Sequence, residues 1–172
     1  MDERIKSLFL RQSFTIKETL HPAELNNIDS DNYDKAINSI LLKKIKDKIG
    51  GKCNKHGFIE RDSITILKRS AASINTSHFN GEMHFNVLVQ ANICHPSEGN
   101  TLICKVIGGN KIGIFAIAEP IHVIVAAAHH ENTSIFESIK PEDEILVEII
   151  NFKLKLNSTN IQVIAKFIKK IN

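Results

Sequence analysis

The residues best suited to recognition chemistry lie around the stretch GGNKIGIF, residues 108–115. Lys111 follows Asn110 in a polar turn, Phe115 lies in the apolar run after it, and Lys105 lies in the run before it. Lysine contacts phosphates and aromatic rings stack on bases, so this grouping is typical of nucleic-acid surfaces. A solvated turn lysine beside a core phenylalanine gives the same pattern, and the spacing alone does not separate the two interpretations.

Other reactive residues form no catalytic or metal-binding pattern. The eight histidines include the adjacent His129 and His130, and Cys94 precedes His95. Adjacent strand residues point to opposite faces, and no Cys-x2-Cys or His-x3-His spacing indicates zinc. Gly-x-Ser-x-Gly, His-Glu-x-x-His and phosphate-loop motifs are missing from the sequence. Cys104 lies inside an apolar run, which favours a buried thiol over a nucleophile. We therefore expect no cofactor, no metal and no active site.

Charge and composition describe a soluble globular protein of one or two small domains. The chain has 172 residues, 42% of them hydrophobic, and a formal net charge of +3. Residues 1–80 hold 14 basic against 10 acidic side chains, and residues 81–172 hold 8 against 9. The helical lysines at 43–48 could contact phosphate or an acidic protein, although a solvated helix face explains them equally simply. Three cysteines without a Cys-x2-Cys pair and the missing signal peptide indicate a reducing compartment and buried thiols, and no apolar run of about 20 residues indicates a membrane span.

Hydrophobic periodicity predicts the elements that must position these residues. We expect a first strand at 7–16, a helix ending at Gly50, a strand at 83–94 and a turn cluster at 95–100. Two short strands should separate the helix from the strand at 83–94, and five further strands should follow the turn cluster as a small barrel or sandwich. The apolar stripe expected on the helix consists of Tyr33, Ile37, Ile40, Leu41, Ile45 and Ile49.

The order of several motifs resembles one known family over roughly 110 residues. The opening strand is followed by His21-Pro22, an amphipathic helix, GKCNKHGFI, and then MHFNVLVQANICHPSEGNTLICKVIGGNKIGIFAIAEP. This series is similar to the large stalk subunit of multisubunit DNA-directed RNA polymerases, meaning the seventh subunit of eukaryotic polymerase II and its archaeal E-prime counterpart. The abundance of Ile, Asn and Lys suits a large DNA virus or an AT-rich cellular organism equally well.

The resemblance implies an α+β chain with two domains and no catalytic activity. Residues 1–93 would form an RNP-like tip domain and residues 94–172 an OB-fold barrel of the ribosomal-protein type. The strand between them would include Phe85, Val87 and Val89. The tip would dock on the polymerase core near the clamp through Lys52, Lys55, His56 and Phe58. The barrel would face exiting RNA through Lys105, Asn110, Lys111 and Phe115.

The resemblance also implies the partners and the compartment. The largest polymerase subunits would be the main partners, with a small helical stalk subunit and weakly held nascent RNA beside them. The protein would act in the nucleus, or in host cytoplasm and virion if a cytoplasmic DNA virus encodes it. We rank polymerase docking above RNA contact, because neutralisation of phosphates supplies most of the non-specific affinity for RNA and the second half of the chain is nearly neutral. Two alternatives stay open: a free-standing OB-fold protein that binds RNA in translation or RNA metabolism, and an enzyme of unknown type.

Overall fold

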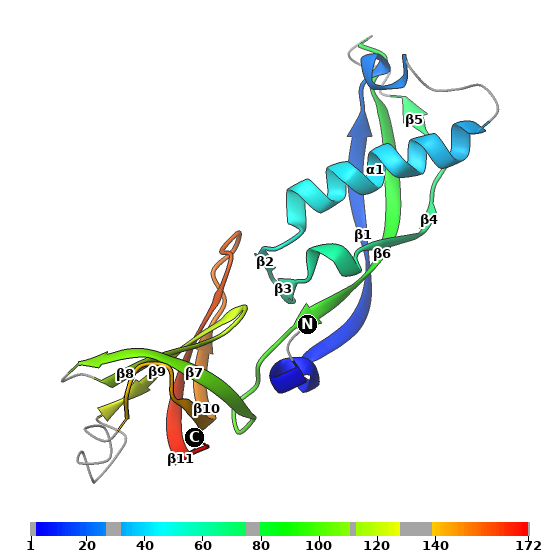
Figure 1. Cartoon of the computed structure of the whole chain (residues 1–172). Helices are drawn as coiled ribbons and strands as arrows, with labels where there is room; N and C mark the ends of the chain where they lie inside the picture. The colour runs from blue at the N-terminus through cyan, green and yellow to red at the C-terminus, as the bar shows by residue number, and fades with distance from the viewer. Residues whose placement is uncertain (1–2, 27–31, 75–79, 111–112, 128–138, 172) are drawn as a thin grey trace. The chain divides into compact units, whose positions relative to one another are not determined.

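The computed structural model describes residues 3–26, 32–74, 80–110, 113–127 and 139–171 (Figure 1). The described residues are mostly β-strand with one α-helix. They divide into two compact units. Unit 1 comprises Met1–Leu10, Lys52–Phe58 and Ile93–Asn172, and unit 2 comprises Arg11–Gly51 and Ile59–Asn92. The tip and OB-domain ranges expected from the resemblance stay predictions.

Unit 1 is built around a closed five-stranded barrel. The five strands predicted after the turn cluster are all present and follow each other around the barrel in the order β10-β11-β9-β8-β7, with β7 also paired to β10. Only the β9–β11 pair is parallel. This arrangement is consistent with an OB fold. The strands are β7 (Thr101–Asn110), β8 (Gly113–Ala118), β9 (Ile121–Ala126), β10 (Glu144–Lys153) and β11 (Ile161–Lys170).

Strict alternation along these strands fills the barrel. On β9, and on β11 as far as residue 166, every second residue is buried and the residues between are partly or fully exposed. Branched side chains fit a pleated, half-buried surface, and burial of each contributes about 1.5–3 kcal/mol. The barrel interior is therefore made of small and branched residues: Leu102, Cys104, Val106, Ile114, Ala116, Ile121, Val123, Val125, Ile145, Val147, Ile149, Ile161, Val163 and Ala165.

The start of the chain corrects one expectation from the sequence. The sequence predicts a strand from residue 7, but Glu3–Leu8 form a 3-10 helix, and the strand, β1, runs from Phe9 to Leu20. Ile5 and Leu8 are almost completely buried in the barrel cluster. The helical turn brings these two apolar side chains to the same core, and an alternating strand would have left Leu8 and Ile5 on opposite faces.

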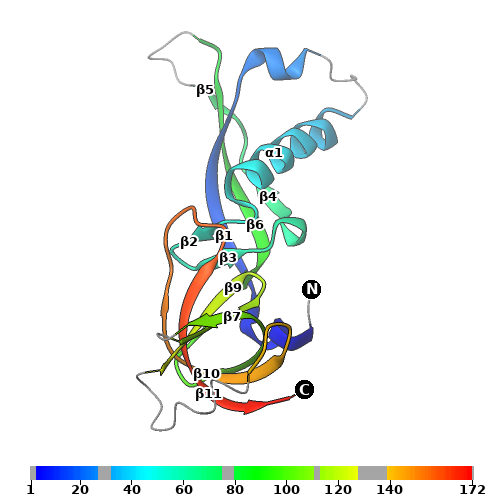
Figure 2. The same cartoon turned by 60° about the vertical axis from the view of Figure 1, so that its left-hand side comes forward.

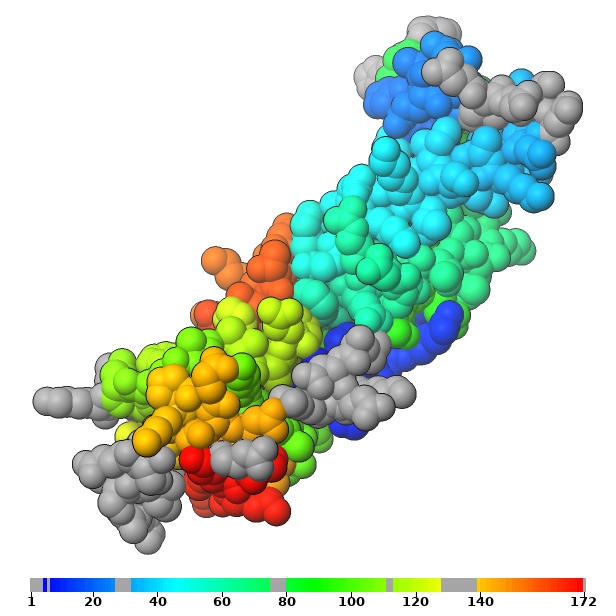
Figure 3. Space-filling view, in the orientation of Figure 1, coloured from blue at the N-terminus to red at the C-terminus, as the bar shows by residue number. Residues whose placement is uncertain are grey.

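Unit 2 is an open sheet with a helix on one face. The predicted helix is confirmed as α1, Tyr33–Ile49, and Figure 1 shows it crossing one face of the sheet over β1 and β6. Its outer side forms part of the molecular surface in Figure 3. Leu41 and Ile45 of the predicted stripe are fully buried, but Tyr33 is 55% exposed at the first turn. The stripe therefore packs only along the middle of the helix.

The remaining elements complete the sheet. β1, β6, β3 and β2 are hydrogen-bonded neighbours in that order, and β4 and β5 also pair with β6 (Figure 2). The predicted strand at 83–94 is confirmed as β6, Met83–Cys94. The other elements are the 3-10 helices η2 (Pro22–Leu25) and η4 (Arg61–Ser63), and the strands β2 (Cys53–Asn54), β3 (Gly57–Ile59), β4 (Thr65–Arg69) and β5 (Ser73–Ile74).

Candidate nucleic-acid interface and docking hairpin

The β7–β8 hairpin places three of the four predicted RNA-contact residues on the outside of the barrel. Asn110 closes the turn, because its Oδ1 accepts a hydrogen bond from the Gly113 amide at 3.2 Å. Phe115 is 38% exposed and lies opposite Gly108. Lys105 lies opposite Ile117 and forms an ion pair with Glu142. The fourth residue, Lys111, lies outside the described residues.

The backbone geometry at residue 113 explains why the hairpin carries a glycine there. Its φ is +158°, and a Cβ built there would lie 2.2 Å from the Val125 backbone oxygen on β9. Real side chains do not approach a carbonyl so closely, so the β8–β9 strand pairing requires glycine here. By contrast, a Cβ on Gly108 would meet nothing within 4 Å. The glycine of the NKIG turn is therefore a packing requirement of the barrel.

A row of exposed apolar residues crosses the outer face of three barrel strands. Phe115 on β8 pairs with Ile124 on β9, and Ile124 pairs with Ile164 on β11. Phe115 and Ile164 are 38% and 41% exposed. The face that includes the second and third strands of an OB barrel is the one that OB folds commonly use for ligands. The structure thus puts Phe115 in a continuous apolar row, whereas Lys105 has a carboxylate partner beside it.

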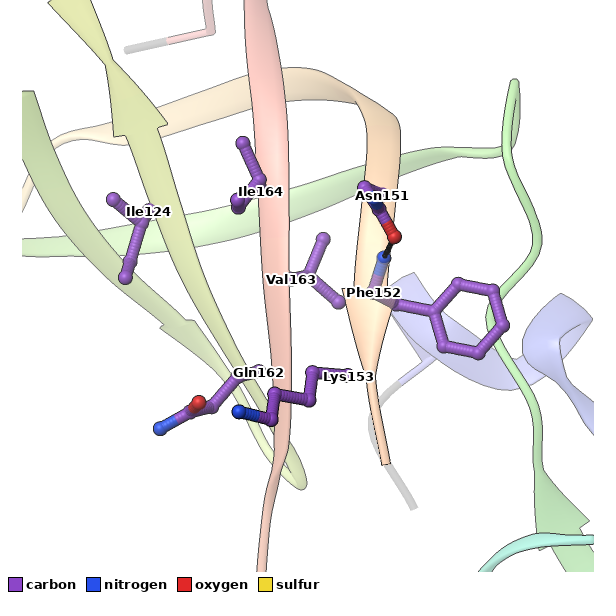
Figure 4. Close-up of a pocket in the computed structure, with 7 residues that line it drawn as sticks. All are labelled: Ile124, Asn151, Phe152, Lys153, Gln162, Val163 and Ile164. Atoms are coloured by element: carbon purple, nitrogen blue, oxygen red, sulfur yellow. Dashed lines mark hydrogen bonds between the residues drawn. The ribbon is translucent and has the colours of Figure 1, made fainter. Parts of the chain in front are cut away.

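A hollow of about 380 Å³ lies next to this row (Figure 4). In Figure 4 the side chains of Lys153 and Gln162 extend toward the same region beside β11, and Phe152 extends to the other side of its own strand. The Phe152 ring contacts His95 edge-on, with ring centroids 5.4 Å apart. The hollow combines apolar walls with amide and ammonium groups and is lined by Ile124, Asn151, Phe152, Lys153, Gln162, Val163 and Ile164.

The sequence did not single out this hollow. IQVIAKFIKK alternates over its first half, and Gln162, Ile164 and Lys166 of β11 are exposed, but the hollow also needs β9 and β10 beside it. Lys153 lies directly opposite Gln162, and Asn151 lies opposite Ile164. Such pairings join residues that are about ten positions apart. They depend on the strand register, which a pattern of alternation does not specify.

Several of the barrel lysines that the structure describes form no ion pair with a described carboxylate. Lys105 pairs with Glu142, and Lys170 pairs with Asp143 at 2.6 Å. The Lys170 ammonium, together with the Lys140 amide, lowers the pKa of the Asp143 carboxyl. Within the described part of the barrel unit, no carboxylate lies within ion-pair distance of Lys153, Lys155, Lys166 or Lys169. The cations available to a ligand are therefore mainly on β10, β11 and the turn between them.

The predicted docking residues lie on the β2–β3 hairpin and next to it. Asn54 Oδ1 accepts hydrogen bonds from the amides of His56 at 2.7 Å and Gly57 at 3.1 Å. Lys55 at the tip of this turn is exposed, and Lys52 and His56 are half-buried. Phe58 packs against the barrel cluster. The four residues are thus close in sequence and in space, but only Lys55 is fully available to a partner.

Cys53 anchors this hairpin to the turn between β10 and β11. Its amide donates to the Ser158 carbonyl at 2.8 Å, and its carbonyl accepts from the Asn157 amide at 2.9 Å. Gly57 has φ +138°, and a Cβ there would lie 2.3 Å from the Cys94 carbonyl oxygen. The cysteine and the glycine of GKCNKHGFI are therefore explained by packing within unit 1.

The three thiols are buried, as predicted. Cys53, Cys94 and Cys104 are free and at most 1% exposed. Burial raises the pKa of Cys94 and of Cys104 to about 12, with a small contribution from the neighbouring Cys53 at Cys94. Burial also raises the pKa of Cys53. Because the thiolate is the reactive form, none of these groups has the environment of a nucleophile.

The acidic, histidine and cysteine side chains of the described residues are scattered. No group of three or more of them within the described ranges could hold a metal ion. The pair His129–His130 lies outside those ranges. None of the helices that the structure describes is long and apolar enough to cross a membrane.

The strand residues expected near the domain junction lie in the core of unit 2. Phe85, Val87 and Val89 on β6 are 2%, 0% and 0% exposed. The guanidinium of Arg69 lies 5.5 Å from the centre of the Phe85 ring and also binds Asn38 and Asp34 of α1. These residues hold the sheet against the helix.

The chain is similar to a viral protein over nearly its whole length. No family model matches the chain. It is 26% identical over 179 aligned positions to a protein of Acanthamoeba polyphaga mimivirus that carries the name "Putative DNA-directed RNA polymerase subunit". The alignment covers 95% of this chain and 83% of the mimivirus protein. The similarity therefore extends over both units.

Proposed function

We propose that this chain is a non-catalytic stalk subunit of a multisubunit DNA-directed RNA polymerase. The observation that carries the proposal is the similarity to a mimivirus protein named as a polymerase subunit, over 95% of the chain. The closed barrel with one parallel strand pair is consistent with the OB domain that such a subunit would contain. The three cysteine thiols are buried, and no group of three or more His, Cys, Asp or Glu side chains within the described residues could hold a metal ion.

In this proposal residues 1–93 act as an RNP-like tip domain and residues 94–172 as an OB domain. The tip docks on the largest polymerase subunits near the clamp. Lys52, Lys55, His56 and Phe58 form the docking hairpin, and the exposed Lys55 makes the most direct contact. A small helical subunit completes the stalk. A viral chain of this kind works in host nucleus or cytoplasm and travels in the virion.

The barrel lies along exiting RNA and contributes weak contacts. Phe115 and Asn110 lie on the exposed β7–β8 hairpin, and the predicted set also includes Lys111 and Lys105. The ion pair between Lys105 and Glu142 lowers the positive charge available to phosphate at that strand. Exposed aromatic rings stack on unpaired bases, so Phe115 supplies the larger part of this contact.

Affinity purification of tagged full-length chain from its native source tests the proposal. The two largest polymerase subunits should co-purify in stoichiometric amounts and remain bound at moderate salt. The substitution Lys55→Glu should reduce their recovery at least fivefold, because it reverses the charge of the exposed docking residue. Lys35→Glu on α1, also exposed, is the matched control and should leave recovery unchanged. Recovery of the chain alone, free of polymerase, would contradict the proposal.

A free-standing OB-fold protein of RNA metabolism is the second candidate. The hollow beside Ile124 and Ile164, together with the unpaired Lys153, favours it, because both could serve an RNA strand without any polymerase. Submicromolar, salt-dependent RNA affinity of the isolated chain, combined with no polymerase in the eluate, would support this candidate over the first.

A further inference from the structure

Unit 2 has a second sheet face, which α1 does not cover. Glu18 of β1 forms an ion pair with Lys48 of α1 at 3.0 Å, so the even-numbered residues of this strand face the helix. Successive strand residues point to opposite sides, so the odd-numbered residues face away from the helix. On this far side the hydroxyl of Thr19 lies 2.9 Å from Nδ1 of His84, which identifies the corresponding face of β6.

The register of the neighbouring strands extends this face. Lys68 and Thr65 of β4 lie opposite Leu88 and Gln90 of β6, and Ser73 of β5 lies opposite His84. We call this surface the open face. Its members are Arg11, Ser13, Thr15, Lys17 and Thr19 of β1, Thr65 and Lys68 of β4, Ser73 of β5, and His84, Asn86, Leu88 and Gln90 of β6.

The permanently charged side chains of the open face are all positive. It holds three permanent cations, and neither a carboxylate nor a Phe, Tyr or Trp ring is among its members. Among the described residues, two carboxylates lie beyond its ends: Glu60 accepts a hydrogen bond from Asn92 at 2.7 Å, and Glu82 lies 3.3 Å from His21. Leu88 is its one large apolar residue. Such a surface gains little from apolar contact and has a positive potential that favours an anionic partner.

The Lys and Arg ion pairs of the described part of unit 2 are on the other side of the sheet. Glu18, Glu24, Asp34 and Asp47 pair with Lys48, Lys44, Arg69 and Arg61, and each pair includes at least one residue of α1 or of a segment beside it. Among the residues that the structure describes, no carboxylate lies within ion-pair distance of Arg11, Lys17 or Lys68. The net positive charge of the first half of the chain is therefore carried largely by residues of the open face and by exposed lysines of the helix.

A shallow hollow lies in the middle of the open face. It measures about 210 Å³ and is lined by Thr15, Lys68, Arg69, Ser70, Asn86 and Leu88. The hydroxyl of Ser70 already accepts from the Asn86 amide at 3.0 Å and donates to the Ala71 carbonyl at 2.8 Å. The side chains of Thr15, Asn86 and Lys68 remain to donate hydrogen bonds to a ligand. Hydroxyl, amide and ammonium donors are the groups that commonly contact phosphate oxygens.

The spacing of the cations fits a polymer better than a single ion. Residues on one face of a strand repeat about every 6.6–6.8 Å, so Arg11 and Lys17 are separated by roughly 20 Å along β1. A free phosphate or nucleotide could contact only one of them. A chain with regularly placed negative charges could contact both and reach Lys68 on the way.

We propose that the open face of unit 2 binds the phosphodiester backbone of nucleic acid without reading its sequence. Apart from His84 and Leu88, the uncharged members are Ser, Thr, Asn and Gln, which hydrogen-bond to phosphate and sugar, and no Phe, Tyr or Trp among the members offers a ring for base stacking. An acidic polypeptide is the competing occupant of this face, and the competition with polyglutamate described below tests it. The binding does not require polymerase association, so the inference goes beyond the proposed function.

Fluorescence anisotropy with the full chain tests this inference. The probes are a labelled 20-nucleotide oligouridylate and a labelled 20-base-pair DNA duplex, each titrated between roughly 50 and 200 mM salt. The variant Lys17→Gln/Lys68→Gln removes two open-face cations. Its affinity for the single strand should fall at least fivefold at low salt, and the slope of log K against log salt should shrink by about 1.4. The two probes decide whether single or double strands are preferred.

A matched variant distinguishes binding at the open face from a general effect of the net charge of the chain. Lys35→Gln/Lys43→Gln removes two exposed α1 cations and changes the net charge equally. Its affinity should fall less than twofold. Equal losses in both variants, or no loss in the open-face variant, would overturn the inference. Circular dichroism should show unchanged folding, because all four lysines are exposed.

Two further measurements keep the alternatives distinct. If only Lys153→Gln/Lys155→Gln on the barrel reduces binding, nucleic acid is held by unit 1 and the inference is wrong. If polyglutamate competes more strongly than oligouridylate at equal charge, the open face is a site for an acidic polypeptide and the inference is again wrong. Loss of polymerase co-purification with intact oligonucleotide binding would contradict the proposed function alone.

Discussion

The two units bury their sheets in different ways and leave different surfaces for recognition. The barrel closes on itself, so its whole inner face is core and its outer face carries an apolar row with a hollow beside it. The sheet of unit 2 stays open, so α1 covers one face and the other remains in solvent. Exposed large apolar residues thus lie mainly on the barrel, whereas unpaired positive charge among the described residues occurs on the open sheet and on β10 and β11 as well. Closure removes free faces and edges, whereas an open sheet retains a face for another partner.

The same contrast extends to the titratable groups. All three cysteines belong to unit 1 and are buried there. Unit 2 has no cysteine in its sequence, and its described residues instead form four carboxylate–cation pairs along the helix side of the sheet. We expect unit 1 to be sensitive to alkaline pH and unit 2 to acid, which gives experimental access to each unit separately.

The largest expected effect is that of Gly113→Val in the barrel. The added Cβ would lie 2.2 Å from the Val125 carbonyl oxygen in a backbone conformation that favours glycine. We expect a loss of about 3 kcal/mol or more in the free energy of unfolding, measured by urea denaturation with far-UV circular dichroism. Gly108→Ala, whose Cβ meets no atom within 4 Å, is the control and should change little. Equal stability of Gly113→Val and wild type would show that β8 and β9 are less closely paired than described.

Leu41→Ala in α1 should have the next largest effect, and within unit 2. Leu41 is fully buried, so truncation should reduce the free energy of unfolding by about 2–5 kcal/mol. Leu67, which is 52% exposed on β4, is the control, because its truncation should change stability by less than about 0.5 kcal/mol. Amide hydrogen exchange should show protection lost first in unit 2. Equal loss of protection in the barrel would show that the two units unfold together.

Alkaline pH should destabilise unit 1 through its thiols. The folded-state pKa of Cys94 and Cys104 is about 12, above the ordinary value of 9.0. Below pH 9 both states keep the proton, and above it only the unfolded state releases it, so stability falls as pH rises from about 9 toward 12. Each thiol should contribute about 1 kcal/mol of this loss at pH 10. Urea denaturation of wild type and Cys104→Ala at pH 8 and pH 10 measures the difference, and an identical pH dependence in the two proteins would argue against the buried thiol.

The smallest effect should come from the ion pair between Lys44 and Glu24 in unit 2. The His21 amide and the Lys44 ammonium lower the pKa of the Glu24 carboxyl. The stabilisation is therefore present above the ordinary value of 4.5 and is lost as pH falls through the lowered folded-state pKa. A double-mutant cycle with Lys44→Met and Glu24→Gln should give a coupling of about 0.3–1 kcal/mol at pH 7 and much less at acid pH. A coupling that does not change with pH would rule out the charge as its source.

Much of the fold could be predicted because local hydrophobic patterns in the sequence determine where strands and helices form. Alternation gave β6 its observed bounds and identified all five barrel strands, and the 3.6-residue period identified α1. The first strand was misplaced because SLF can alternate or form a 3-10 turn, and only the contacts of Ile5 and Leu8 with the barrel core decide between them. Tyr33 was assigned to the buried stripe because periodicity does not indicate where the partner sheet ends.

The candidate sites were less predictable, because they depend on which residues become neighbours. The sequence by itself determined that Lys105 and Phe115 flank a polar turn, that three thiols would be buried, and where the helix and most of the strands lie. Only the tertiary structure decided that Glu142 neutralises Lys105, that Ile124, Gln162 and Lys153 share a hollow, and that Lys17 and Lys68 lie on one uncovered face. The physical reason is that side-chain direction follows from local backbone geometry, whereas charge pairing and surface shape follow from strand register between distant segments.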